Sequence, residues 1–467
     1  MPINITFFKV YRIQLLFVIT SLLFYCSFAY DLVRTDYIKL ISLYTALFFL
    51  FYKLIQLTKH NLKLLTWMAF GFRAVFILAI PNLSQDFYRF IWDGRMILEG
   101  FNPYLYTPES FIANGEFAVA QAQELYAGMG NLSASHYTNY PPLNQLCFVI
   151  TGLFAGNNIL GSAVVLRFII IAADFGTLHF GKKLLEKLKL PAHNIFWYIL
   201  NPFIIIELTG NLHFEGVMIF FLVWSLYLLH SGKWQLAAVV FACSVSIKLI
   251  PLLFLPLFYQ WFTKRDASTK PVLSIVERLS LAKLIGFHLI VIATIVVLFL
   301  PFYSSQFITN YAETVGLWFY NFEFNGSLYY IAREIGYLFR GYNEIAIIGT
   351  YTAIIVFLFV VAMTLLRKNT TMTQLITAML FALSFYYFTA TTVHPWYVAT
   401  LLILSIFTKY KFPLIWSFVI ILSYLAYLQI GKADKSENLW IIAIEYLIVY
   451  GFLIWELFIK KQKSLTK

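Results

Sequence analysis

Long apolar runs recur along almost the whole chain and constrain its fold more than any other feature. A helix needs about 20 mainly apolar residues to cross a bilayer, and 61% of the 467 residues are hydrophobic while only 12% are charged. We place apolar spans near residues 13–30, 36–52, 64–81, 159–180, 194–208, 213–230, 234–248, 249–263, 281–301, 344–366, 373–390, 396–408, 413–430 and 437–459. The sequence therefore predicts an all-α polytopic membrane protein, a bundle of about 12–14 transmembrane helices.

Other classes of protein fit this pattern less well. A β-barrel would show alternating rather than continuous hydrophobicity. The net charge is +12, but the basic residues lie in short clusters between apolar runs, as the positive-inside rule describes. We therefore expect no nucleic acid as partner. The cysteines, Cys26, Cys147 and Cys243, lack the paired spacing of disulfides or metal clusters. The first run has no small-residue cleavage site and is interpreted as an anchor.

The basic clusters also predict the orientation of the chain. If lysine-rich segments such as 181–190 are cytoplasmic, two long segments lie outside, at 82–140 and 302–343. The apolar segment 140–156 cannot then be a full crossing, so we expect it to enter the membrane and return, or to lie along its outer face. No linker or soluble domain interrupts the pattern, and we treat 1–467 as one membrane domain.

The densest polar cluster is "SQDFYRFIWDGRMILEGFNPYLY" at residues 84–106. It is predicted to form a helix over 85–100, with Ser84 as N-cap and a proline-containing end. The pattern is amphipathic, so we expect the helix at the membrane interface with Trp92 at headgroup depth.

Charged residues of this helix have two interpretations. Asp86, Arg89 and Asp93 share one stripe at spacings of three and four residues. Arg89–Asp93 and Arg95–Glu99 are spaced as ordinary i,i+4 ion pairs on a wet surface. Asp86 instead lies where the preceding span ends, and an ionised carboxylate there can accept a proton from a substrate.

Further polar residues fall at the predicted outer ends of spans. Lys248, in "SIKLIPLLFLP", is an intramembrane cation, which either faces a cavity or extends to the headgroups. His213 and Glu215 lie in "GNLHFEG", where they would contact an acceptor, share a metal or cap the interface. His394, in "TTVHPWY", is either a functional group or part of an aromatic belt.

Two more polar features remain open at this stage. Asp174 lies within an apolar run, and we expect it to pair with a neighbouring helix or with Arg167. The segment "YNFEFNGSLYY" at 320–330, which contains Asn325, would stack a sugar ring or form an aromatic-rich interfacial loop.

These motifs together resemble a known family. "SQDFYRFIWDGRMILEGFNPYLYTP", followed by "YPPL", "GNLHFEG", "SIKLIPLLFLP" and "VHPWY", is similar to polytopic glycosyltransferases of the GT-C fold. More narrowly, it resembles bacterial mannosyltransferases that use polyprenyl-phosphate mannose, of the glycosyltransferase family 87 type. The likeness runs over about residues 64–410. One departure is that three spans precede the first large loop in this chain, whereas in the family that loop follows the first helix.

The resemblance implies roles for the polar residues. It makes Asp86 the essential carboxylate, with Asp93 as second candidate, in a transfer that inverts the anomeric carbon. Arginine binds phosphate oxygens in a bidentate manner, so nearby basic residues become candidates for the donor phosphate. We assign Arg89, Arg95, Lys248 and His394 to the donor phosphate, and Tyr140, His213, Glu215 and Asn325 to the acceptor or sugar.

The expected partners and location follow from these assignments. They are a polyprenyl-phosphate sugar donor, a glycan or glycolipid acceptor and membrane lipids, with the protein in a bacterial inner membrane and its site facing outward. No Gly-rich phosphate loop is present, so no nucleotide or organic cofactor is expected; the need for a divalent metal stays open.

Two alternatives to a monosaccharide transferase remain. A transporter or flippase of lipid-linked sugars would also place polar groups among many helices, but transporters concentrate charge near the midplane and show repeated halves. Here the charges gather at one face and no repeat is visible. A ligase for whole glycans ranks lower only because the 84–106 motif resembles monosaccharide transferases.

Overall fold

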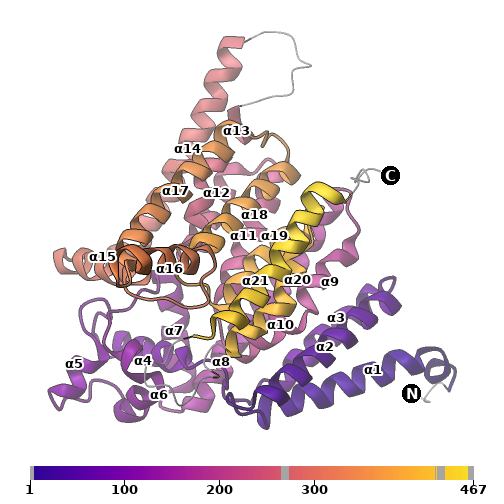
Figure 1. The fold of residues 1–467 in the computed structure, drawn as a ribbon, viewed down its shortest axis with the longest axis horizontal. Coiled ribbons are helices and arrows are strands. Elements are labelled where there is room, and N and C mark those ends of the chain that lie inside the picture. Colours follow the sequence, from indigo (N-terminus) through magenta and orange to yellow (C-terminus); the bar gives the residue numbers. More distant parts are fainter. Residues whose placement is uncertain (1–4, 264–272, 426–427, 429–436, 461–467) are drawn as a thin grey trace.

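A computed structural model describes residues 5–263, 273–425, 428 and 437–460 (Figure 1). Throughout these ranges every regular element is a helix. The one β feature among them is an isolated parallel bridge between Phe324 and Thr392. The predicted all-α class is confirmed.

Seven of the described helices are long and apolar enough to cross a membrane. They lie within α1 (Ile5–Tyr30), α2 (Tyr37–Thr58), α8 (Ile159–Lys187), α14 (Leu273–Phe299) with η4 (Leu300–Phe302), α17 (Ile345–Leu365), α18 (Met372–Thr389), and α21 (Leu439–Ile454) with η7 (Trp455–Ile459). The chain is therefore a polytopic membrane protein.

One apolar helix pair is sharply bent and is either a broken eighth span or a re-entrant loop. Pro202–Gly210, made of α10 (Pro202–Ile204) and the π-helix η2 (Ile205–Gly210), meets α11 (Glu215–His230) at 115°. Five shorter apolar helices are α7 (Pro142–Ala155), α12 (Trp234–Val245), η3 with α13 (Ile250–Leu257, Phe258–Thr263), η5 with α19 (Pro395–Tyr397, Val398–Ile406), and α20 with η6 (Phe412–Val419, Ile420–Leu425). The predicted total of about 12–14 spans is reached only if these also cross.

The remaining helices connect or flank the spans. They are α3 (Leu62–Val75), α4 (Asp86–Leu98), α5 (Pro108–Ala113), α6 (Ala122–Ala134), η1 (Ala192–Ile195), α9 (Phe196–Ile199), α15 (Ser305–Tyr320) and α16 (Leu328–Arg340). Figure 1 shows α4–α6 together at one end of the molecule, with α15 and α16 close by and α14 projecting at the opposite end. The α1–α3 layer covers one side of the bundle. The predicted span 64–81 is shorter than expected, because α3 ends at Val75.

A buried ion pair joins the α1–α3 layer to the bundle. Arg73 Nε lies 2.7 Å from Asp174 Oδ2, and neither side chain is exposed. Arg73 also donates through Nη1 to the carbonyl of Ile199 at 2.7 Å. The expectation that Asp174 pairs with a neighbouring helix is confirmed, but Arg167 is not the partner.

Arg167 instead supports the break before α11. Its guanidinium donates to the carbonyls of Thr209 and Gly210 at 2.8 and 3.0 Å, which a π-helical end leaves without regular partners. Leu212 follows with φ of 63°, a backbone conformation that costs energy for a branched residue. The arginine thus holds the turn that carries His213.

Helix α4 lies flat against α7 because Gly94 allows it. A Cβ atom built at Gly94 would lie 2.2 Å from the carbonyl oxygen of Phe148, so any larger residue separates the two helices. Phe90 stacks on Phe148 with ring centroids 4.6 Å apart, and Phe214 meets both rings edge-on. This contact fixes α4 relative to the start of α11.

Two details of the predicted helix 85–100 are wrong. The N-cap is Gln85, without a side-chain cap bond, although the Ser84 hydroxyl does accept from the Asp86 amide at 3.3 Å. Trp92 is fully buried, rather than at headgroup depth. Helix α4 packs against both α6 and α7, so protein rather than lipid covers much of it.

Candidate active site

Five polar side chains predicted from the sequence meet where helices begin. Asp86 and Glu215 are the first residues of α4 and α11. Tyr140, Lys248 and His394 stand within two residues of the first residues of α7, η3 and η5. All five line one cavity, so the structure brings together residues up to 308 positions apart in the sequence.

The cavity has a volume of about 500 Å³, and its two ends differ in polarity. The polar end holds the five residues above, together with Asn139, Trp396 and Tyr397. The apolar end is walled by η3 and α17, through Leu252, Leu253, Pro256, Val356, Phe357 and Val360. Leu252 is 39% exposed and Phe357 is 62% exposed. The apolar end therefore opens onto the side of the bundle, where a membrane protein faces lipid.

Asp86 is the carboxylate at the polar end. A third of its side chain is exposed, and it lines the cavity. Removal from water raises its pKa to about 6; Lys248 opposes this shift, and Glu215 adds to it. Burial disfavours the charged form of an acid. Near pH 7 the carboxylate is thus ionised yet basic enough to accept a proton, which suits a general base.

Lys248 faces the cavity rather than the headgroups. Its Nζ lies 3.0 Å from Glu215 Oε1, and the ammonium sits 5.3 Å from the ring centre of Tyr140. Of the two earlier interpretations, the cavity-facing cation is the one that the geometry favours. Glu215 Oε2 is buried without a hydrogen-bond partner, so one oxygen of this pair is available to a ligand.

A column of stacked rings reaches the polar end through Trp396 and His394, whereas His213 itself does not line the cavity. His213 lies on Trp396 with centroids 3.6 Å apart, and Trp396 lies on His394 at 4.6 Å. His394 continues onto Phe324 at 5.2 Å. Burial, with the charges of Lys248 and Arg34, lowers the pKa of His394 to about 3. At neutral pH His394 is therefore an uncharged hydrogen-bonding group.

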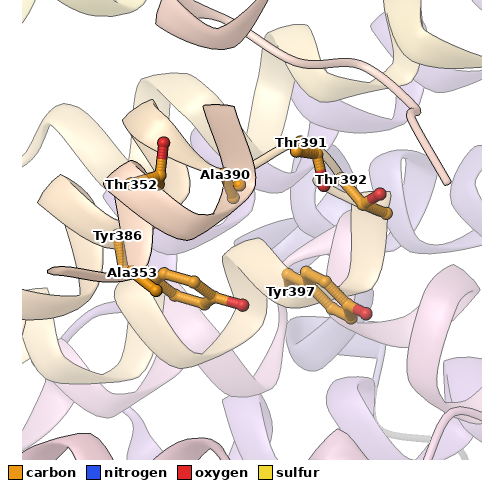
Figure 2. Close-up of a pocket in the computed structure, with 8 residues that line it drawn as sticks. Thr352, Ala353, Tyr386, Ala390, Thr391, Thr392 and Tyr397 are labelled. Carbon is orange, nitrogen blue, oxygen red and sulfur yellow. The ribbon is translucent and has the colours of Figure 1, made fainter. Parts of the chain in front are cut away.

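A second, smaller cavity of about 40 Å³ adjoins the first (Figure 2). Tyr386, Tyr397 and Ala353 line both cavities. Thr391 and Thr392 lie beyond the end of α18, on the segment that bridges to Phe324. The small cavity has room for about one water molecule, and Figure 2 shows Tyr386 and Tyr397 among the side chains that line it.

Asp93 and Arg89, two candidates on α4, lie outside the cavity lining. Asp93 is fully buried, 2.7 Å from Arg89 and 3.2 Å from the amide of Gln145. Arg89 also donates to the carbonyl of Ser133. The expected i,i+4 pair is present, but inside the protein rather than on a wet surface. For Asp93 and Arg89 the geometry favours a structural role, because their charges neutralise each other away from the cavity.

Arg95 and Asn325 are also engaged elsewhere. Arg95 donates to the carbonyl of Ala120 at 2.6 Å, and not to Glu99 as the spacing suggested. Asn325 Nδ2 donates to Glu445 at 3.2 Å, and its backbone amide donates to Glu437. The Arg95 contact joins two parts of segment 82–140, the Asn325 contact ties segment 320–330 to α21, and neither residue lines the cavity.

Sequence reasoning missed several residues of this region. Glu207 lies 3.9 Å from His213 and accepts from Tyr424 at 2.8 Å, and Arg34 lies over the Tyr424 ring. Glu207 could have been found from the sequence, because it is an acidic residue within an apolar run and a charged residue in a membrane segment is a functional candidate, as argued for Lys248. Nothing local marks Tyr424 or Arg34, since only the fold brings them close.

The part of the chain that the structure describes holds no group of three or more His, Cys, Asp or Glu side chains arranged for a metal ion. His213 and Glu215 accordingly do not form such a group with their described neighbours.

The fold and cavity define a polytopic membrane protein whose charged site adjoins an apolar groove. Residues 31–264 match the family model described as alpha-(1->6)-mannopyranosyltransferase, N-terminal domain, over half of the chain. The chain belongs to this family, which confirms the resemblance to mannosyltransferases. The matched region contains Asp86, Tyr140, His213, Glu215 and Lys248.

Two curated relatives carry the name alpha-(1->6)-mannopyranosyltransferase A. The protein of Mycobacterium tuberculosis is 22% identical over 189 residues, 40% of this chain and 34% of its own length. The protein of Corynebacterium glutamicum is 25% identical over 193 residues, 40% of this chain and 36% of its own length. The alignments thus span about a third of the length of these relatives.

Proposed function

We propose that the protein is an integral membrane mannosyltransferase that uses polyprenyl-phosphate mannose as donor. The acceptor is a glycan or a lipid-linked glycan, and the reaction takes place on the extracytoplasmic side. One observation carries the proposal: a carboxylate and a lysine share a cavity whose other end is apolar and open to the side of the bundle. Such a cavity matches a donor with a sugar phosphate at one end and an isoprenoid chain at the other.

Asp86 acts as the general base in this proposal. The acceptor hydroxyl oxygen forms a bond to the anomeric carbon of mannose, and its proton passes to the Asp86 carboxylate. The bond from that carbon to the phosphate oxygen breaks, and polyprenyl phosphate leaves with the electron pair. Attack from the face opposite the phosphate inverts the anomeric carbon, so no covalent intermediate with the enzyme is needed.

Lys248 binds the donor phosphate, where negative charge increases as the bond breaks. A cation held in a partly desolvated site stabilises such charge more than it would in water. Glu215 positions the ammonium at 3.0 Å, and its free oxygen accepts from a sugar hydroxyl. His394, being neutral, contributes a hydrogen bond to the phosphate, and Tyr140 lies beside the lysine to contact the sugar.

The names of the two relatives support mannose as the sugar and an α-(1→6) linkage in the product. A transporter or flippase would move the same donor without breaking it, so the decisive measurement is transfer itself. Radiolabelled polyprenyl-phosphate mannose and octyl α-mannoside serve as donor and acceptor for the purified full-length chain.

The test compares Asp86→Asn with a matched control at the opposite end of the same helix. Asp86→Asn is expected to lose transfer by about 10²–10⁴-fold while donor binding is retained. Glu99→Gln, an equally conservative change at the exposed end of α4, is expected to transfer at the normal rate. Full transfer by Asp86→Asn removes this carboxylate from the mechanism.

The side of the membrane is tested separately by labelling. In a background without the native cysteines, Glu116→Cys lies in the segment 82–140 and Lys183→Cys lies in 181–190; both native positions are exposed. A membrane-impermeant maleimide added outside intact cells should label the first variant and not the second. The reverse pattern would place the site on the cytoplasmic side.

A further inference from the structure

His213 has a carboxylate at each of its two ring nitrogens. Nδ1 lies 4.0 Å from Asp86 Oδ2, and Nε2 lies 3.9 Å from Glu207 Oε2. Its side chain is only 1% exposed, and among the described residues Nε2 has no hydrogen-bond partner. The ring is held flat against Trp396. The imidazole therefore stands between the proposed base and a second, buried acid.

The contacts continue from Glu207 to the surface. Both Glu207 oxygens accept from the Tyr424 hydroxyl, at 2.8 and 2.9 Å. Arg34, an exposed residue between α1 and α2, sits 5.9 Å over the Tyr424 ring. Asp86, His213, Glu207, Tyr424 and Arg34 thus form a line from the cavity to the end of the α1–α2 hairpin.

This line of residues offers a route by which Asp86 can release its proton when the cavity is occupied. Asp86 receives one proton in each turnover and must release it before the next. Its exposed part faces the cavity, which a bound lipid donor would fill. A proton held by Asp86 then needs a route through the protein rather than through the cavity water.

We propose that His213 is a positioning residue that passes the proton from Asp86 to Glu207, and that this route resets the base while donor or product still fills the cavity. Nδ1 takes the proton from the Asp86 carboxyl group, and the proton on Nε2 goes to Glu207. Water at the Arg34 end then takes the proton from Glu207 by way of the Tyr424 hydroxyl. No bond other than those to hydrogen changes, and the imidazole returns to its starting form by a change of tautomer.

The two distances from His213 to Asp86 and Glu207 fit a relay whose hydrogen bonds form only during turnover. A gap of about 4 Å is too long for a direct hydrogen bond, so a small side-chain shift completes each step. Catalytic hydrogen bonds are often longer in the free enzyme than in its complexes. The charged and titratable groups around His213 come from seven parts of the fold: Arg34, Asp86, Glu207, Glu215, Lys248, His394 and Tyr424.

The inference rests on the proposed transfer activity, and the experiment separates the two. The full-length His213→Ala variant is assayed with radiolabelled polyprenyl-phosphate mannose and octyl α-mannoside, with and without imidazole. Transfer should fall about tenfold or more through kcat, with KM nearly unchanged. Added imidazole should restore part of kcat in a saturable manner, because it can occupy the space that the side chain leaves.

Matched variants distinguish a relay from a packing role. His230→Ala, at the far end of α11 and outside the cavity lining, should keep normal activity and show no response to imidazole. Glu207→Gln keeps an acceptor for Tyr424 but cannot take a proton, so its kcat should also fall; it carries the test if His213→Ala does not fold. A folded His213→Ala variant with normal kcat, or with reduced kcat that imidazole leaves unchanged, overturns the relay. An inactive wild-type protein would contradict the transferase proposal instead.

Discussion

The pH dependence of transfer offers a quantitative test of the proposed base. The pKa of Asp86 is raised to about 6 by burial, and kcat/KM reports the ionisation of groups in the free enzyme. At pH 5 only about one Asp86 in eleven is ionised, so kcat/KM should be about tenfold below its plateau. An aspartate with an ordinary pKa near 3.9 would leave the profile almost flat down to pH 5.

Two variants should move this acidic limb in opposite directions. Glu215 raises the pKa of Asp86 and Lys248 lowers it. Glu215→Gln should therefore shift the limb to lower pH, and Lys248→Met should shift it to higher pH, whatever either change does to the plateau. The assay is kcat/KM for labelled mannose transfer between pH 4.5 and 8. A limb that is absent, or one that moves in the same direction in both variants, refutes the assignment of Asp86 as base.

Three further predictions concern the scaffold and the groove. Gly94→Ala should destabilise the protein by about 1–3 kcal/mol or more, seen as a lower unfolding temperature in detergent, because a Cβ meets the Phe148 carbonyl at 2.2 Å; an unchanged temperature would mean that α4 and α7 are not in close contact. Arg73→Met alone should cost roughly 3–5 kcal/mol by leaving Asp174 buried without its partner, whereas the double variant Arg73→Met/Asp174→Leu should recover most of that loss; additive losses would contradict the buried pair. Val360→Trp should raise KM for a long-chain donor more than for a short-chain analogue, because Val360 lines the apolar end of the cavity; equal effects on both donors would show that the chain does not bind there.

The sequence could predict which residues gather at the site, but not the rotation of each helix about its axis, which decides where their side chains point. Asp86, Glu215, Lys248 and His394 are recognisable because each is a polar residue at the end of an apolar run, and the fold brings all four to one cavity. The inward orientation of Asp93 depends on how α4 rotates about its axis. That rotation is set by the contact of Gly94 with α7, which no local pattern encodes.

Pairings between distant segments were likewise beyond the sequence. Asp174 finds Arg73 across 101 positions, although Arg167 lies nearer along the chain. Trp92 is buried by α6 and α7, and an amphipathic pattern alone cannot distinguish lipid from protein as the covering surface. The all-α class was predictable, because it depends only on the length of apolar runs.

The groups proposed to react or bind substrate all stand at the beginnings of helices or in the connections before them. The spans that hold these positions need only keep their length, packing and hydrophobicity. Many sequences meet these requirements. Most residues of the spans can therefore change during evolution while the reaction is preserved. A change in one short connection can instead alter the acceptor. Natural variants with altered glycan products should accordingly differ first at these junctions.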